Sequence, residues 1–233
     1  MFKESAMTLP ARKTETERFT YADYLTWTDD ERCELIDGQT YAMSPAPGTA
    51  HQEVLLKLAS KIQAFMGKGP CQVFVAPFDV RLAEAGENTS SCSNVVQPDI
   101  SVICDSDKLD EKGCIGAPDW AIEILSPSTS SKDQVKKRHL YEKHGVKEFW
   151  LIHPTERTAT IYYLKSGNYA LKGIYDDTAT LKSHEFKGLS VRLKEILPVI
   201  RVVKEKVCPY CANRNKPAEN KKHATRSKGK TQE

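Results

Sequence analysis

The 233-residue sequence contains no apolar run near the ~20 residues that a helix needs to span a bilayer. Its beginning, Met1 to Pro10, also lacks the basic start and apolar segment of a secretory signal. We therefore expect a cytoplasmic protein with no membrane span. Hydrophobic residues make up 39% and charged residues 28%, which excludes a fibrous or wholly disordered chain and is typical of a soluble globular one.

Cysteine is sparse and odd in number, with seven residues in the chain. Apart from Cys208 and Cys211, the cysteines stand singly in apolar stretches. This pattern predicts reduced thiols in a core rather than a disulfide framework.

Positive charge is unevenly distributed. The formal net charge is +3, yet residues 206–233 contain eight Lys and Arg residues against Glu219 and Glu233. This end is polar and has no apolar residue after Ala224, which predicts a flexible tail. Such a tail either adds sequence-independent attraction to phosphates or is only a solvated end. We predict an N-terminal extension (1–18), one domain (19–205) and a basic tail with a Cys-x-x-Cys pair (206–233).

Hydrophobic periodicity predicts helices and strands in mixed order. Thr20 can cap a short helix within 19–27, and Asp37-Gly38 indicates a β-hairpin. The expected long helices cover 49–66 and 131–144, and the expected strands cover 71–75, 78–82, 95–104, 120–125, 148–153 and 158–164. This order predicts an α/β domain with antiparallel elements, its helices flanking a sheet.

Acidic residues interrupt two of the apolar strands. The strand period of two places Gln97, Asp99 and Ser101 on one face of the first strand. The same rule places Glu123 opposite Ile122 and Ile124 in the second. Taken singly, each acid is better explained as a solvated residue on an exposed face. If the strands are neighbours, the two carboxylates repel unless a cation joins them, and a hard divalent ion is the natural partner.

A third acid, Glu34, lies in the predicted hairpin. A surface acid at the start of a strand explains Glu34 about as well as a functional role does.

Five blocks together resemble the Uma family of restriction-endonuclease-like proteins, within the PD-(D/E)XK nuclease superfamily. They are Glu34-Leu-Ile-Asp-Gly, His51, Val-Val-Gln-Pro-Asp99, Ile-Glu123-Ile-Leu-Ser-Pro-Ser and Lys137-Arg-His-Leu-Tyr141. The resemblance covers Phe19 to Leu197, and the order and spacing of the blocks make it specific. It implies a restriction-endonuclease-like core with a central mixed β-sheet flanked by helices, and a Mg2+-dependent phosphodiesterase site.

The chain departs from the superfamily pattern at one position. Pro98-Asp99 and Glu123 match the acidic elements, but Leu125 stands where the pattern has lysine. Related proteins take this lysine from the following helix. A spacing of ~100° per residue places Lys137 on the same arc as Leu140 and Tyr141. Lys137 therefore points either toward the site or, with a buried stem, out to solvent.

The resemblance implies a metal-dependent endonuclease acting on DNA. Its expected catalytic residues are Asp99, Glu123, Lys137 and Glu34, and its expected Mg2+ ligands, which would also accept Mn2+, are Asp99, Glu123 and the carbonyl of Ile124. Gln97 and Tyr141 are expected to support the site. His51 is either a further supporting group or a surface residue at a helix start.

The sequence also allows other interpretations of the function. Because the lysine beside Glu123 is missing, the alternative is a catalytically inactive nuclease-fold protein that binds nucleic acid or a protein partner. Cys208 and Cys211 have the spacing of a dithiol or half a zinc site, although an unoccupied pair of thiols explains them better. A homodimer would suit cleavage of both DNA strands.

Overall fold

The computed structural model describes residues 18–27, 33–43, 47–84, 86–126 and 132–199. Backbone contacts divide the chain into Met1–Pro198 and Val199–Glu233, and the description below concerns the first unit. Cys208, Cys211 and the basic tail lie outside the described residues, as do residues 1–17. The predicted domain boundaries therefore stay predictions.

The described residues form two larger sheets and one small one. The first sheet has the order β2-β1-β5-β4-β8-β7, with β2 (Gln39–Ala42), β1 (Cys33–Ile36), β5 (Val95–Val96), β4 (Val80–Arg81), β8 (Gly113–Ile115) and β7 (Leu109–Asp110). The second has the order β12-β11-β10-β9-β6-β3, with β12 (Asn168–Tyr175), β11 (Thr158–Lys165), β10 (Glu148–His153), β9 (Trp120–Ile124), β6 (Ile100–Ile103) and β3 (Gln72–Val75). Within the second sheet, β9 and β10 are parallel and the other pairings are antiparallel. The small sheet pairs β13 (Thr180–Lys182) with β14 (Ser190–Arg192).

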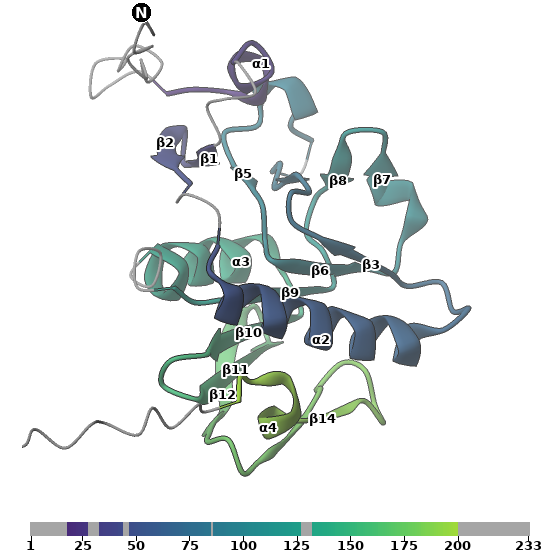
Figure 1. Ribbon diagram of the computed structural model, residues 1–233. Helices are drawn as coiled ribbons and strands as arrows, with labels where there is room; N and C mark the ends of the chain where they lie inside the picture. The colour runs from purple at the N-terminus through teal and green to yellow at the C-terminus, as the bar shows by residue number, and fades with distance from the viewer. Residues whose placement is uncertain (1–17, 28–32, 44–46, 85, 127–131, 200–233) are drawn as a thin grey trace, which may run out of the picture. The chain divides into compact units, whose positions relative to one another are not determined.

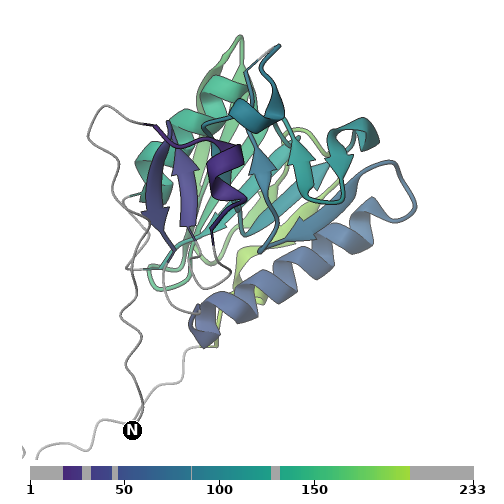
Figure 2. The same ribbon diagram turned by 90° about the horizontal axis from the view of Figure 1, so that it is seen from above.

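Helices cover both faces of the second sheet (Figure 1). The described helices are α1 (Tyr21–Tyr24), α2 (Thr49–Met66), η1 (Thr89–Ser91), η2 (Ser106–Lys108), η3 (Lys132–Lys137), α3 (Arg138–His144) and α4 (Leu193–Ile196). On one face, α2 packs Leu58 and Ile62 against Ile122. On the other, α3 packs Leu140 and Tyr141 among residues of β9 and β10. Figure 2 shows α2 running along the outside of the strands as a separate layer.

Several local predictions are confirmed. Thr20 caps α1, with its hydroxyl accepting from the Asp23 amide. Asp37 and Gly38 join β1 to β2 with φ angles of 50° and 73°, the left-handed conformation that a tight two-residue hairpin turn requires. The long helix covers Thr49–Met66 and ends at Gly67, as its apolar spacing predicts.

Other expectations are wrong in detail. The expected strand over 95–104 is broken into β5 and β6, which belong to different sheets. The break contains Gln97, Pro98 and Asp99, and proline there lacks the amide that a strand ladder needs. The second long helix begins as the π-helical η3 before α3. The short β7–β8 hairpin and the β13–β14 pair were not expected.

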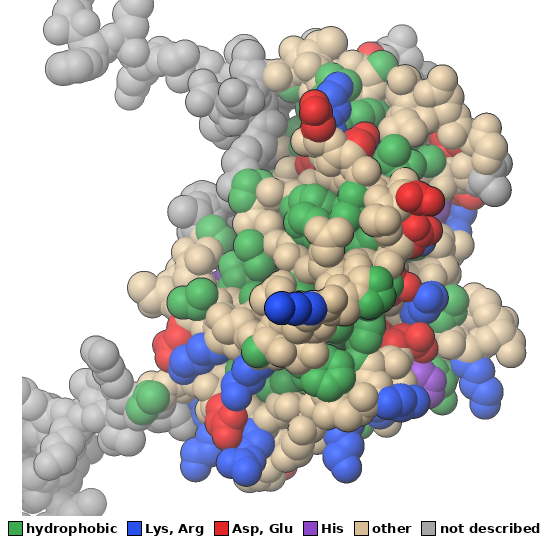
Figure 3. Space-filling model, turned by 90° about the vertical axis from the view of Figure 1, so that its right-hand side faces the viewer, with side chains coloured by type: hydrophobic (Ala, Val, Ile, Leu, Met, Phe, Trp, Pro, Cys, Tyr) green, Lys and Arg blue, Asp and Glu red, His purple; other side chains and the backbone are tan. Residues whose placement is uncertain are grey.

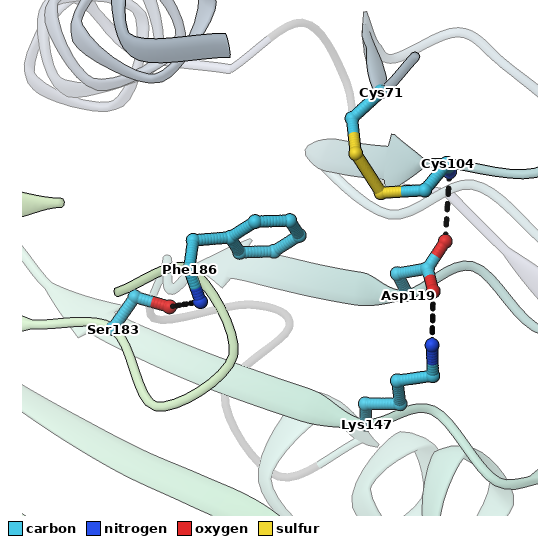
Figure 4. Close-up of a disulfide and its surroundings, with 6 residues drawn as sticks. All are labelled: Cys71, Cys104, Asp119, Lys147, Ser183 and Phe186. Atoms are coloured by element: carbon cyan, nitrogen blue, oxygen red, sulfur yellow. Dashed lines mark hydrogen bonds and ion pairs between the residues drawn. A yellow bond between two sulfur atoms is a disulfide. The ribbon is translucent and has the colours of Figure 1, made fainter. Parts of the chain in front are cut away.

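The cysteine prediction is corrected at one pair. Cys71 and Cys104 form a disulfide that joins the end of β6 to the start of β3 (Figure 4). They are close because Gln72 and Ile103, the adjacent residues, are partners in the β3–β6 ladder. Beside the disulfide, the Cys104 amide donates to Asp119 at 2.7 Å. The other described cysteines, Cys33, Cys92 and Cys114, are buried, as expected for core thiols.

Within the described residues, no helix is both long and apolar enough to cross a bilayer.

Candidate functional site

A buried lysine joins two acidic side chains from different sheets. Lys137 Nζ lies 2.8 Å from Glu34 Oε1 and 2.8 Å from Glu123 Oε1. Glu34 comes from β1 and Glu123 from β9, and their exposed fractions are 1% and 3%. The interpretation of either glutamate as a solvated surface acid is therefore wrong. A buried carboxylate needs a positive partner, and Lys137 supplies one to both.

The inward direction of Lys137 follows from the helix that carries it. Lys137 is the last residue of η3, and Leu140 and Tyr141 follow on the first turn of α3. Leu140 and Tyr141 are buried against the sheet, so the lysine on their arc is buried with them and is 3% exposed. Lys136 and Val135 on the outer side are exposed. Lys137 is thus not a snorkelling surface lysine.

Tyr141 supports the same carboxylate. Its hydroxyl donates to Glu123 Oε1 at 2.7 Å, and its ring is fully buried. Burial, with the negative charge of Glu123 adding to it, raises the pKa of Tyr141 well above its ordinary value. The hydroxyl therefore stays protonated and remains a hydrogen-bond donor.

Asp99 immediately precedes β6, so it lies at the end of a strand rather than in the middle of one. Its Oδ2 accepts from the Ile124 amide at 2.7 Å, which places the carboxylate beside the residue that follows Glu123. Its Oδ1 is 3.1 Å from His51 Nε2. Asp99 thus lies beside the last residue of β9 and contacts His51 of α2, whereas the Glu123 carboxylate contacts Lys137 and Tyr141 from the η3–α3 segment.

His51 lies in the first turn of α2 and is 9% exposed, so the surface interpretation of this histidine is wrong. The Nε2 atom faces Asp99, whereas Nδ1 is buried and has no hydrogen-bond partner among the described residues. His51 therefore fixes the direction of the Asp99 carboxylate from the α2 side.

A second polar cluster holds Glu34 in place. The backbone amide of Gln97 donates to Glu34 Oε1 at 2.9 Å. The side-chain Nε2 of Gln97 donates to Asp79 Oδ1 at 2.8 Å. Tyr24 OH also donates to Asp79 Oδ1, at 3.2 Å. Burial raises the pKa values of both Asp79 and Tyr24. Gln97 was expected near the site, but Asp79 and Tyr24 were not.

The family model described as "Putative restriction endonuclease", Uma2, matches residues 21–197. The chain belongs to the Uma2 family.

Two known proteins show how far this Uma2 chain resembles its relatives. Protein slr1290 of Synechocystis sp., itself described as uncharacterized, is 27% identical over 144 residues, which cover 60% of this chain and 72% of the relative. A crystal structure from Anabaena variabilis, described as a "putative nuclease belonging to DUF820", has a TM-score of 0.62 and 24% sequence identity. The alignment covers 76% of this chain and 97% of the Anabaena chain. The predicted restriction-endonuclease-like fold, with helices flanking a mixed sheet, is thereby confirmed.

The donor chemistry of the Uma2 site suits a hard cation. Asp99 and Glu123 offer carboxylate oxygens at the same end of β9, and Mg2+ in proteins is commonly held by one or two carboxylates with water completing its shell. Among the described residues, no three His, Cys, Asp or Glu side chains are grouped as a preformed metal site. Asp99, Glu123 and the Ile124 carbonyl stay the predicted ligands of such an ion.

Proposed function

We propose that this Uma2 protein is a Mg2+-dependent endonuclease that hydrolyses phosphodiester bonds in DNA. The observation that carries the proposal is the Lys137 ammonium, buried between Glu34 and Glu123. A nuclease of this superfamily needs a cation close to its acidic residues, and the position two after Glu123 is Leu125. Lys137 supplies a cation beside Glu123 from the following helix. The missing lysine was the main support for a catalytically inactive binding protein, so this support is weakened.

Each residue of the site would have its own role in hydrolysis. Asp99 and Glu123 would hold the ion, Mg2+ or Mn2+, with Asp99 oriented by His51 and the Ile124 amide. The ion, when bound, would lower the pKa of a water and polarise a phosphate oxygen. Lys137 would orient the attacking water and offset negative charge at the phosphorus. Tyr141 would keep Glu123 in position, and Glu34, held by the Gln97 amide, would keep Lys137 in position.

Incubation with supercoiled plasmid tests this function. We expect nicked and linear products with Mg2+ and none with excess chelator. Asp99→Asn should abolish cleavage and weaken Mn2+ binding in a calorimetric titration. Asp107→Asn, a matched change at an exposed aspartate of η2, should cleave as the parent does. Binding of DNA without cleavage in any metal would support the non-catalytic alternative instead.

The cytoplasmic location and the homodimer stay predictions. The Cys71–Cys104 disulfide counts against the cytoplasmic location, because disulfides are rare in the reducing cytosol.

A further inference from the structure

A basic groove lies between the β1–β2 hairpin and the η3–α3 segment. Its volume is about 450 Å³, and its cationic lining residues are Arg18, Lys136 and Lys143, with His139 beside them. Asp37 is the one acid among its described lining residues. The groove therefore presents an excess of positive charge.

Two residues that line the groove are neighbours of residues in the candidate site. Tyr41 of β2 is the cross-strand partner of Glu34 on β1, and Lys136 precedes Lys137 on the helix. Lys136 Nζ contacts the Tyr41 hydroxyl at 2.5 Å and lies 4.2 Å from its ring centroid. The buried contact between Glu34 and Lys137 therefore has an exposed counterpart, the contact between their neighbours Tyr41 and Lys136.

The positive charges of the groove are available to a ligand. Neither Arg18 nor Lys136 forms an ion pair with any acid in the described part of the chain. Lys143 pairs with Glu84 at 2.6 Å, but both side chains are 56% exposed, and such surface pairs are weak. The backbone next to Arg18 is anchored to the hairpin turn, because the Phe19 amide donates to the Gly38 carbonyl at 2.8 Å.

We propose that this groove binds the sugar–phosphate backbone of the nucleic-acid strand that enters the site. The inference rests on the proposed function and adds where the substrate lies. An arginine fork and lysine ammonium groups recognise phosphate oxygens. Exposed Val135 and the Tyr41 side chain add apolar contact for sugar or base. Because phosphate contacts carry no sequence information, the groove positions DNA without specifying a sequence.

A separate group of lysines provides a matched control. Lys and Arg side chains also gather on the lower part of the face shown in Figure 3. Lys172, Lys182 and Lys187 lie near one another, since the pKa of Lys172 is lowered chiefly by burial and further by the other two lysines. The β13–β14 segment that carries Lys182 packs with α2, on the opposite face of the sheet from α3. Lys187 is exposed in the connection between β13 and β14.

Fluorescence anisotropy with a labelled DNA duplex tests the groove. The full chain is used in excess chelator, so that binding is measured without metal-dependent cleavage and the basic tail is the same in every variant. Lys136→Glu and Arg18→Glu should each weaken binding about 10-fold near 0.1 M salt. Each should also reduce the slope of log affinity against log salt by about one. Lys187→Glu should change affinity less than about twofold.

The outcomes separate this inference from the proposed function. The proposal that the groove binds DNA is contradicted if both groove variants bind DNA as the parent does. It is also contradicted if Lys187→Glu loses as much affinity as they do, or if the parent binds no DNA. Selective loss in the groove variants supports it, even if the parent cleaves no plasmid with Mg2+, in which case only the proposed function fails. If the parent cleaves plasmid but both groove variants bind DNA as the parent does, the proposed function stands and the proposed DNA-binding role of the groove fails.

Discussion

At the scale of single residues, the site is a balance of buried charges. Two glutamates and one lysine share a space with almost no solvent, and Tyr141 adds a neutral donor. Removing one member of a buried ion pair leaves the remaining charge without compensation, which costs more than the pair itself contributes. The groups that we propose as catalytic therefore also stabilise the fold, so alanine variants at Glu123 or Lys137 should lower the free energy of unfolding.

Lys137→Met tests this balance. The change keeps a side chain of similar length but removes the charge, so we expect a loss of about 3–5 kcal/mol in the free energy of unfolding. Plasmid cleavage should be lost as well. Urea denaturation measures the first effect, with Lys68→Met, at an exposed lysine beyond α2, as the control. Equal stability of Lys137→Met and the parent would contradict the charge balance.

Tyr141→Phe removes only a hydroxyl. Because that hydroxyl donates to a buried carboxylate, the variant should lose about 1.5–3 kcal/mol of stability and part of its cleavage rate. Tyr169→Phe is the matched control, because the Tyr169 hydroxyl is buried and has no hydrogen-bond partner among the described residues. The control should unfold at the same urea concentration as the parent or higher. A reversed order of the two variants would refute the role given to Tyr141.

At the scale of elements, two clamps hold the strands that lead into the site. One is the disulfide, which ties the edge strand β3 to β6, the strand that follows Asp99. The other is Arg81 of β4, which is 2% exposed and donates from Nη1 to Asp110 of β7 at 2.9 Å. Both fasten short strands that have few ladder hydrogen bonds of their own.

The disulfide should contribute measurably to stability. It closes a loop with a sequence separation of 33, so replacing both cysteines by serine should cost about 2–4 kcal/mol. Urea unfolding of the parent should shift to lower concentration when a reductant is added. The double variant should not respond to reductant. If the parent is also indifferent to reductant, the cross-link does not form in solution.

The Arg81–Asp110 clamp should depend on pH. The hydrogen bond from Arg81 lowers the pKa of Asp110 below its ordinary value of 3.8. The carboxylate therefore stabilises the fold above about pH 3.8, and this contribution is lost as the pH falls through the lowered pKa. Asp110→Asn should be less stable than the parent by roughly 1–2 kcal/mol at pH 7, a modest figure because Asp110 is 40% exposed. The difference should vanish in urea unfolding near pH 2–3, and a constant difference across pH would exclude the ion pair as its cause.

At the scale of the whole molecule, local periodicity predicted much of the fold and part of the site. The arc of Lys137, Leu140 and Tyr141 could be read because side chains three and four apart share one helix face, and this holds although η3 is π-helical. The hairpin turn could be read because Asp-Gly suits positive φ angles. These are properties of neighbouring residues, which the sequence displays directly.

What could not be predicted depends on contacts between distant segments. Cys71 and Cys104 become neighbours only through the register of β3 with β6. Asp79 and Tyr24 join Gln97 only once α1 and the chain before β4 are folded beside the same strand break. The burial of Glu34 also requires the η3–α3 segment to cover the hairpin, since Lys137, at the end of η3, is its partner. No spacing within a single segment carries this information.

The central claim, that Glu123 belongs to a hydrolytic site, is tested most directly by single-turnover cleavage of plasmid in Mg2+. Glu123→Gln keeps the size of the side chain and one acceptor oxygen while removing its charge. Glu185→Gln makes the same change at an exposed glutamate in the connection between β13 and β14. We expect the first variant, folded by circular dichroism, to cleave at least about 100-fold more slowly than the parent, and the second to match the parent. Equal rates for the parent and Glu123→Gln would contradict the account.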